Sequence, residues 1–200
     1  GDVYKRQAYN RLNDTDFRKL EWVAPAGSPI ANKVSFVNKT YGASMPPMAS
    51  VKFRPNQGEM DAPSVAAATA FPVMRVEEML LIEAEATGRD NLAAGKQKLE
   101  AFVKGYRDAT YICNATNLDE FIDEIWFQRR IELWGEGFSL FDVLRLKKPI
   151  KRIGTNFPAG STFADIAAES PLLIYTIPEC ETAVNKAITP ADNNEAAIPP

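Results

Sequence analysis

The segment that most constrains the fold is residues 128–146, QRRIELWGEGFSLFDVLRL, which places many charges among apolar side chains. Its charged residues are Arg129, Arg130, Glu132, Glu136, Asp142 and Arg145. Leaving one charge unpaired in a core costs about 3–5 kcal/mol, so these groups should form a matched set. Arg129 lies three residues before Glu132, a spacing that puts both on one helical face. We therefore expect a structural charge network here.

A catalytic interpretation of the same segment stays open. Glu132 and Glu136 are four residues apart and share a helical face if the helix continues past Gly135. Glycosidases use two carboxylates that flank the scissile bond, and Trp134 could serve as a platform for the sugar. Glutamate pairs at this spacing occur in many helices, so the pattern is unspecific and the structural interpretation is favoured.

Composition excludes several classes of protein. There is no histidine, which removes the usual general base, Ser–His and Cys–His nucleophiles and HExxH zinc sites. The net charge of −3, without a run of like charges, gives no indication of a nucleic-acid partner. Cys113 and Cys180 are expected as two isolated buried thiols, with a single disulfide left open. No metal or cofactor is expected, and no run is apolar for the roughly 18 residues of a membrane-spanning helix.

Residues 71–147 are expected to form a helical core. A first helix begins after Pro72 and continues to Gly88, and its apolar positions cover more than one face, which predicts burial on two sides. Asn91 is placed to cap a second helix, in which apolar side chains recur at helical spacing. Two helices of similar length joined by a short turn predict a stack of helix hairpins.

A third helix is predicted to begin at Asn117, where Glu120 completes a capping box. Gly135 and Gly137 should end it, and a short helix over 139–146 should follow. The fold class is therefore mainly α.

The flanking segments are expected to be irregular. Residues 8–70 are rich in loops, with short strands near 33–37 and 51–54. Residues 148–200 return to irregular structure, with a short buried strand in LLIYTIPECE and a loosely held tail. Residues 1–7, GDVYKRQ, resemble translated sequencing-adapter sequence and are interpreted as non-native, which suggests a chain truncated at its N-terminus.

Three ordered motifs point to a known family. The first lies in FPVMRVEEMLLIEAEA, with matching residues Arg75, Glu78, Leu81, Ile82, Ala84, Glu85 and Ala86. The second is the charged segment, with Arg129, Arg130, Glu132, Leu133, Glu136, Gly137, Asp142 and Arg145. The third is Ile177, Pro178, Glu181 and Asn185, and an upstream Asp-x-Arg element is found at Asp16 and Arg18. Together these resemble the C-terminal half of the SusD/RagB family. Gln128 and Ser139 depart from the family pattern, which usually has Glu and Arg there.

The resemblance implies a mainly α fold of tetratricopeptide-like helix hairpins with long irregular loops. It implies no catalysis. Members are outer-membrane, surface-exposed nutrient-binding lipoproteins of Bacteroidetes-type bacteria. They hold oligosaccharide, or in some cases peptide, over a SusC-like TonB-dependent transporter. Their only attachment to the membrane is an N-terminal lipid anchor, which is expected to lie in a part absent from this sequence.

Glycan recognition would come from exposed aromatic side chains that stack on sugar faces. The candidates are Trp22 and Tyr41, in the loop-rich region, whereas Trp126 and Trp134 are expected in the core. Two alternatives stay open beside a glycan-capturing lipoprotein. One is a carbohydrate-active enzyme that uses Glu132 and Glu136, and the other is a helical-repeat scaffold that binds peptides.

Overall fold

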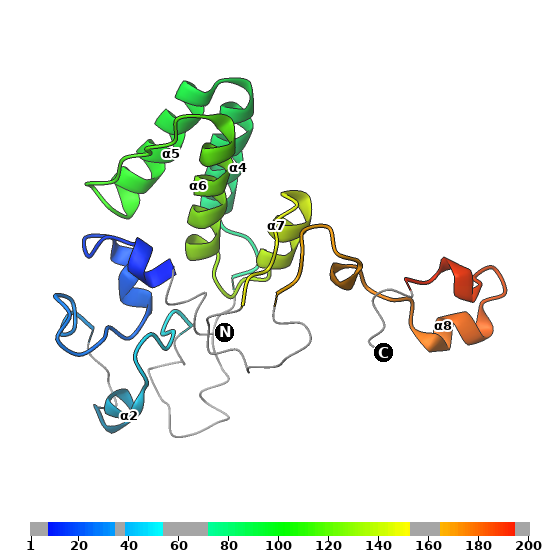
Figure 1. The fold of residues 1–200 in the computed structure, drawn as a ribbon. Helices are drawn as coiled ribbons and strands as arrows, with labels where there is room; N and C mark the ends of the chain where they lie inside the picture. The colour runs from blue at the N-terminus through cyan, green and yellow to red at the C-terminus, as the bar shows by residue number, and fades with distance from the viewer. Residues whose placement is uncertain (1–7, 35–38, 54–71, 153–164, 195–200) are drawn as a thin grey trace. The chain divides into compact units, whose positions relative to one another are not determined.

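The computed structural model describes residues 8–34, 39–53, 72–152 and 165–194, which Figure 1 draws as a coloured ribbon. Within these ranges the chain is mainly helical and forms no strands, which confirms the expected fold class. The longer helices are α4 (Val76–Asp90), α5 (Leu92–Tyr106) and α6 (Leu118–Glu132). The shorter ones are η1 (Phe17–Glu21), α2 (Lys39–Ser44), α7 (Ser139–Arg145), η3 (Pro171–Leu173), α8 (Glu179–Val184) and η4 (Pro190–Asp192).

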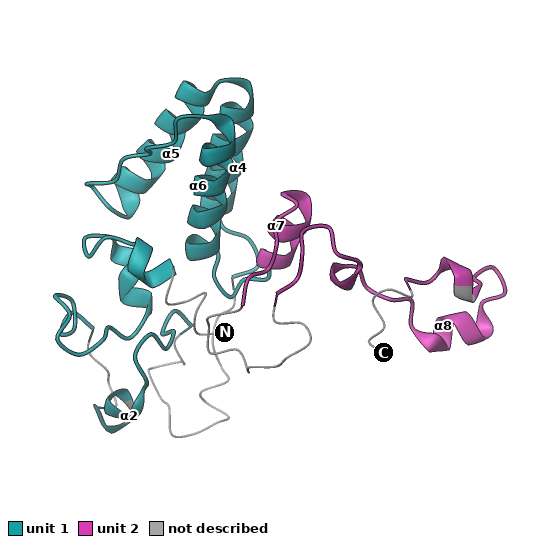
Figure 2. Cartoon of the chain, viewed as in Figure 1, with its two compact units in different colours: residues 1–138 teal, residues 139–200 magenta. Residues whose placement is uncertain are grey.

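The chain divides into two compact units, Gly1–Phe138 and Ser139–Pro200, which Figure 2 distinguishes by colour. The first contains the three longer helices, and both α5 and α6 contact α4. None of the described helices combines the length and the apolar character that crossing a bilayer requires.

The hairpin of α4 and α5 depends on a single connecting residue, Asn91. Its backbone N–H donates to the carbonyl of Thr87 at 2.7 Å and closes α4. Its side-chain oxygen accepts from the N–H of Ala94 at 3.1 Å and caps α5. Asn91 therefore ends one helix and begins the next, as the sequence predicts.

Glycine lets these two helices approach closely. A β-carbon on Gly95 would lie 2.6 Å from the backbone nitrogen of Gly88 and 3.0 Å from the carbonyl oxygen of Ala84. A β-carbon on Gly88 would in turn meet the ring of Phe121 on α6. The packing of the three helices therefore relies on two positions without a side chain.

The capping box at the start of α6 is confirmed, with one difference. Asn117 accepts from the N–H of Glu120 at 3.0 Å. The Glu120 carboxylate reaches back past Asn117 and accepts from the N–H of Thr116 at 2.7 Å. The helix ends at Glu132, before Gly135 and Gly137, whose φ angles of 77° and 91° lie in the left-handed region that favours glycine.

A separate apolar cluster holds the N-terminal loops against α6. It consists of Tyr9, Leu12, Trp22, Ile30, Phe127 and Ile131. The predicted strand over 51–54 is wrong for its described residues, because they form only loop, with one isolated bridge between Trp22 and Ser50 beside them. Of the strand expected near 33–37, residues 35–37 lie outside the described ranges.

The predicted strand in LLIYTIPECE is also wrong. Ser170 accepts from the N–H of Leu172 at 3.3 Å, and Pro171 stands at the first position of η3, so a local turn forms instead of an extended chain. Tyr175 is 84% exposed, and Pro178 is the N-terminal cap position of α8. Apolar composition alone suggested burial here, and the local turn signals override it.

Burial of α4 on two sides is not observed. Its buried face is Leu81, Ala84, Glu85 and Gly88. Val76, Met79 and Ile82 form another face and are 66%, 45% and 44% exposed. Among the described residues, α5 and α6 cover one side of α4 only.

The close approach of α4 and α5 predicts opposite effects for two glycines of α5. Gly95→Ala should lower the free energy of unfolding by about 1–3 kcal/mol, because the new methyl group meets the backbone of Gly88. Gly105→Ala is the matched control, since a β-carbon there has nothing within 4 Å. It should be neutral or stabilising by up to about 1 kcal/mol through helix propensity. Chemical denaturation of the two variants measures both, and equal stabilities would contradict the packing.

Candidate functional site

The carboxylate of Glu132, at the end of α6, is the centre of a buried charge network. It accepts from Nε and Nη2 of Arg107, both at 2.8 Å, and from Nη1 of Arg75 at 3.1 Å. Nη1 of Arg18 lies 3.5 Å away. Glu132 is 4% exposed, so it is a buried carboxylate that three arginines neutralise.

Glu136 shares one of these cations, Arg75, and also binds Lys52. Its carboxylate accepts from Nζ of Lys52 at 2.6 Å and from Arg75 at 2.9 and 3.0 Å. Lys52 also donates to the carbonyls of Glu132 and Trp134, at 2.7 and 3.1 Å. Cations at these positions pair the carbonyl groups that a helix leaves without partners at its C-terminus.

The surroundings of Glu132 favour a permanently ionised carboxylate over a group that transfers protons. Burial alone would raise the pKa of Glu132, but the hydrogen bonds from Arg107 and the charges of Arg18 and Arg75 outweigh it and hold the pKa below its usual value. A general acid needs the opposite shift. Glu132 therefore stays ionised, and its oxygens accept hydrogen bonds from arginine side chains.

Glu21 behaves differently from the other acids near the network. One of its carboxylate oxygens, Oε2, is buried and has no hydrogen-bond partner. Burial raises the pKa of Glu21 to about 7, opposed by the charges of Lys52 and other cations and supported by that of Glu132. Glu21 is thus a half-buried residue whose carboxyl group changes charge near neutral pH.

The other residues predicted for the network have separate partners. Nη2 of Arg129 is 3.8 Å from Glu78, and the guanidinium of Arg130 lies 5.1 Å from the ring of Trp126. Asp142 pairs with Arg145 at 2.7 Å inside the second unit. Within the predicted set, Glu132 and Glu136 are joined through a shared cation, Arg75.

The cationic partners of Glu132 and Glu136 were not assigned to the network from sequence. Arg18 and Arg75 stand in family-like motifs, and the family resemblance also includes the Tyr-Arg pair with Arg107 at the end of the second predicted helix. Lys52 had no signal beyond its charge. Their separations from Glu132 along the chain explain this, since they range from 25 to 114 residues.

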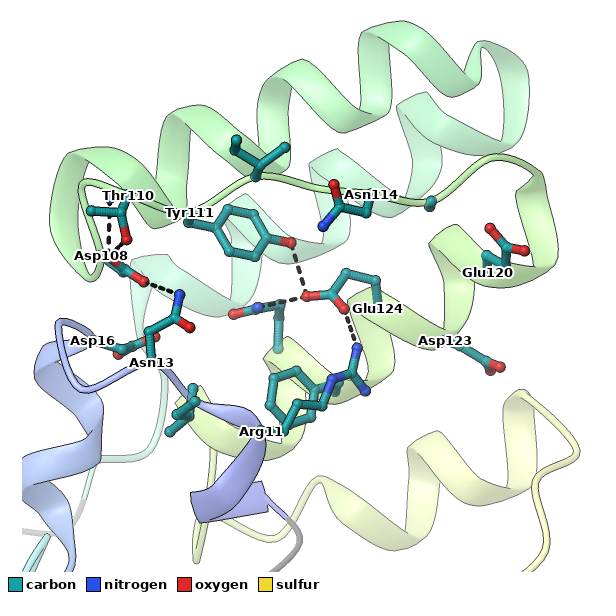
Figure 3. A pocket seen from close by; sticks show the side chains of 15 residues that line it. Arg11, Asn13, Asp16, Asp108, Thr110, Tyr111, Asn114, Glu120, Asp123 and Glu124 are labelled. Carbon is teal, nitrogen blue, oxygen red and sulfur yellow. Dashed lines mark hydrogen bonds and ion pairs between the residues drawn. The ribbon is translucent and has the colours of Figure 1, made fainter. Parts of the chain in front are cut away.

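Beside the network lies a cavity of about 630 Å³, which Figure 3 shows. The N-terminal turn, the loop that follows α5, and α6 line it, and it is open to solvent. The residues that line it are Arg11, Leu12, Asn13, Asp16, Asp108, Thr110, Tyr111, Ile112, Asn114, Ala115, Glu120, Asp123, Glu124, Phe127 and Gln128. Its wall is rich in carboxylate and amide groups, which bond hydroxyls.

Hydrogen bonds fix the inner wall of the cavity. Asp108 accepts from Asn13, Thr15 and Thr110 at 3.0, 2.9 and 2.7 Å. Burial alone would raise the pKa of Asp108. The hydrogen bonds that it accepts outweigh burial and lower this pKa, and the bond from Asn13 contributes most. The loop after α5 is therefore tied to the N-terminal turn by a carboxylate that stays charged.

A second carboxylate, Glu124, ties the loop to α6. It accepts from the hydroxyl of Tyr111 at 2.8 Å, from Nε2 of Gln128 at 2.7 Å and from Arg11. Burial and the charge of Glu124 raise the pKa of Tyr111, so the phenol stays protonated and donates. Gln128 also accepts from Arg18 at 2.7 Å, and so connects the cavity wall to the charge network.

Of the two aromatic residues predicted for ligand binding, the structure describes the side chain of Trp22 alone. Trp22 is 1% exposed and packs in the N-terminal apolar cluster, so it offers no ring face on which a sugar could stack. The side chain of Tyr41 lies outside the described part of the structure. Trp126 and Trp134 are partly buried. Sequence reasoning missed the cavity because loop residues form much of it.

The cysteines differ from each other. Cys113 is buried, as expected, but Cys180 is exposed, and both are free thiols. No group of acidic or cysteine side chains in the described ranges is arranged to hold a metal ion.

Comparison with known proteins identifies the family. The model of the SusD family matches residues 1–190, and the chain therefore belongs to this family, as its motifs predicted. Its structure is similar to that of a SusD-like carbohydrate binding protein from Bacteroides vulgatus ATCC 8482, with a TM-score of 0.63 and 25% identity. The similarity covers 94% of this chain and 40% of that one, so the chain spans less than half the length of that protein. No curated protein sequence matches the chain.

The raised pKa of Glu21 predicts how stability depends on pH. Between pH 4.5 and about 7 the folded chain keeps a proton on Glu21 that the unfolded chain has released. Stability should therefore fall as pH rises through this window. Glu21→Gln should remove the loss and be more stable than the parent by on the order of 2 kcal/mol above the window, and equal to it below.

Thermal unfolding over this range of pH measures the effect. Glu83→Gln, the same change at an exposed position, is the control and should follow the parent. Parallel curves for the parent and Glu21→Gln would contradict the prediction.

Proposed function

We propose that this chain is part of a non-catalytic glycan-binding protein that captures oligosaccharides at the cell surface. Membership of the SusD family over residues 1–190 carries the proposal. The name of the Bacteroides vulgatus structure, a SusD-like carbohydrate binding protein, supports glycan as the ligand. The hydroxyl-bonding groups of the cavity wall agree with such a ligand.

The proposal extends to uptake. The protein would be held at the outer membrane by an N-terminal lipid anchor and would deliver its ligand to a SusC-like TonB-dependent transporter. These parts rest on the family alone, and they describe the whole protein rather than this chain.

The arrangement of Glu132 and Glu136 supports a non-catalytic role. A glycosidase needs one carboxylic acid that can give up a proton and one carboxylate that can reach the sugar. Here both side chains are at most 4% exposed and bonded to arginine or lysine. A sugar would have to displace these cations to reach either group.

Binding to an array of glycans tests the proposal on the full 200-residue chain. At least one oligosaccharide should bind reversibly, and none should be cleaved when released reducing ends are measured. A folded chain that binds extended peptides and no glycan would favour the peptide-binding scaffold instead. Circular dichroism establishes that the chain tested is folded.

Glu136→Gln separates the structural role from the catalytic one. The variant removes the negative charge that pairs with Lys52 and Arg75 in a buried setting. It should therefore lower the free energy of unfolding by about 3 kcal/mol. Glu83→Gln is again the exposed control and should change little. Loss of a measurable glycosidase activity, with the stability of Glu136→Gln unchanged, would contradict the structural role.

A further inference from the structure

Two exposed aromatic residues of the first unit lie in segments that meet in the fold. Among the described side chains of this unit, Phe17 and Tyr106 are the exposed aromatic ones, at 57% and 66%. Phe17 begins η1, and Tyr106 is the last residue of α5. The backbone N–H of Phe17 donates to the carbonyl of Arg107, the residue after Tyr106, at 2.9 Å. The two rings therefore come from neighbouring backbone positions, although they are far apart in the sequence.

The residues on either side of Phe17 reverse the usual arrangement, in which apolar side chains are buried and charged ones are exposed. Asp16 and Arg18 are 3% and 1% exposed, and their side chains pair at 2.7 Å. Asp16 also accepts from the backbone N–H of Arg18 at 2.9 Å and so caps η1. The backbone that carries Phe17 is thus fixed by two buried charged residues, and it holds an apolar ring in solvent.

The end of α5 fixes Tyr106 in a similar way. Its carbonyl accepts from Nη1 of Arg107 at 3.0 Å, and Nε and Nη2 of the same guanidinium are bonded to the buried Glu132. The ring of Tyr106 packs against Phe102, with centroids 6.3 Å apart, and this contact leaves the residue 66% exposed. A ring that is already held on one side has less conformational freedom to lose when a ligand binds.

The surroundings of the two rings favour a sugar over a protein as the ligand. A protein interface has a contiguous apolar core. Beside these rings, residues 13–16 and 107–110 are polar except for Ala109. The hydroxyls of Thr15 and Thr110, one from each segment, lie 3.3 Å apart, and both residues are exposed. Aromatic rings with polar groups beside them match a sugar, which has both apolar C–H groups and hydroxyls.

We propose that Phe17 and Tyr106 form an aromatic platform that binds an oligosaccharide by stacking on the C–H faces of its pyranose units. The inference rests on the proposed glycan-binding function and adds the residues and the kind of contact. A pyranose unit has a face of C–H groups, and placing this face on an aromatic ring removes apolar surface from water. Its hydroxyls project from the edge of the sugar ring, where polar residues beside the platform can bond them.

Calorimetric titration of the full 200-residue chain tests the platform. The probes are maltohexaose and cellohexaose, glucose chains with α and β links, together with every oligosaccharide that binds on the glycan array. Phe17→Ala and Tyr106→Ala should each weaken binding of the ligand by roughly three- to tenfold, because each removes one stacking contact. Phe17→Tyr and Tyr106→Phe keep the rings and should bind as the parent does.

Tyr175→Ala is the matched control. Tyr175 is a tyrosine of the second unit that is 84% exposed, so the variant removes an exposed ring outside the platform and should leave affinity unchanged. Thermal unfolding shows whether each variant keeps the fold. Phe17→Leu and Tyr106→Leu replace any alanine variant that does not, since they keep an apolar side chain and remove the ring.

Saturation-transfer NMR gives a readout that a merely structural role would not change. Saturation of the aromatic protons of the parent chain should pass to the C–H protons of the bound sugar. The transfer should fall in Tyr106→Ala and persist in Tyr106→Phe and Tyr175→Ala. Equal transfer in all three variants would overturn the stacking contact at Tyr106.

The outcomes separate this inference from the function on which it rests. If the chain binds a glycan, and Phe17→Ala and Tyr106→Ala bind it as tightly as Tyr175→Ala does, the platform is wrong and glycan binding stands. If the ring-keeping variants lose affinity as the alanine variants do, stacking is wrong and glycan binding again stands. If a folded chain binds none of the oligosaccharides, both proposals fail.

Discussion

The pairing of Glu132 with arginines from distant segments is the interaction on which the first unit depends. Arg107 comes from the end of α5, Arg75 from the residue before α4, and Arg18 from η1. These residues lie 25, 57 and 114 positions from Glu132 in the chain. A buried carboxylate must keep its partners, because leaving it alone costs several kcal/mol. One side chain thus fixes where two helices and the N-terminal loop meet.

The same stripe of α6 connects this network to the cavity. Glu124, Gln128 and Glu132 follow one another at intervals of four residues and therefore share one helical face. Gln128 departs from the family pattern, which usually has glutamate there. As an amide it can both accept from Arg18 and donate to Glu124, at 2.7 Å each. An ionised glutamate could accept from Arg18 but would have no proton to donate to Glu124. Glutamine at this position therefore connects the charge network to the cavity wall without placing two carboxylates in contact.

The helices could be predicted because their signals are local. Asn91, Asn117 and Gly135 act within a few residues of themselves, and each marks a helix boundary in the sequence and in the structure. The strand expected in LLIYTIPECE was wrong because apolar composition does not distinguish a buried strand from an exposed turn. The cation partners of Glu132 could not be predicted, since no spacing rule relates residues this far apart. The cavity was missed for a similar reason, because the loop after α5 that lines it has no periodic pattern.

Acidic side chains have two different roles in this one unit, and their surroundings decide which. At the end of α6, arginine and lysine surround Glu132 and Glu136, so these carboxylates hold distant segments of the chain together through ion pairs. Around the cavity, most hydrogen bonds to the carboxylates come from neutral donors such as Asn13, Thr110 and Tyr111. Neutral donors fix the position of a carboxylate without cancelling its charge. The acids at the end of α6 are therefore neutralised by cations, whereas Asp108 beside the cavity is held in place mainly by neutral donors.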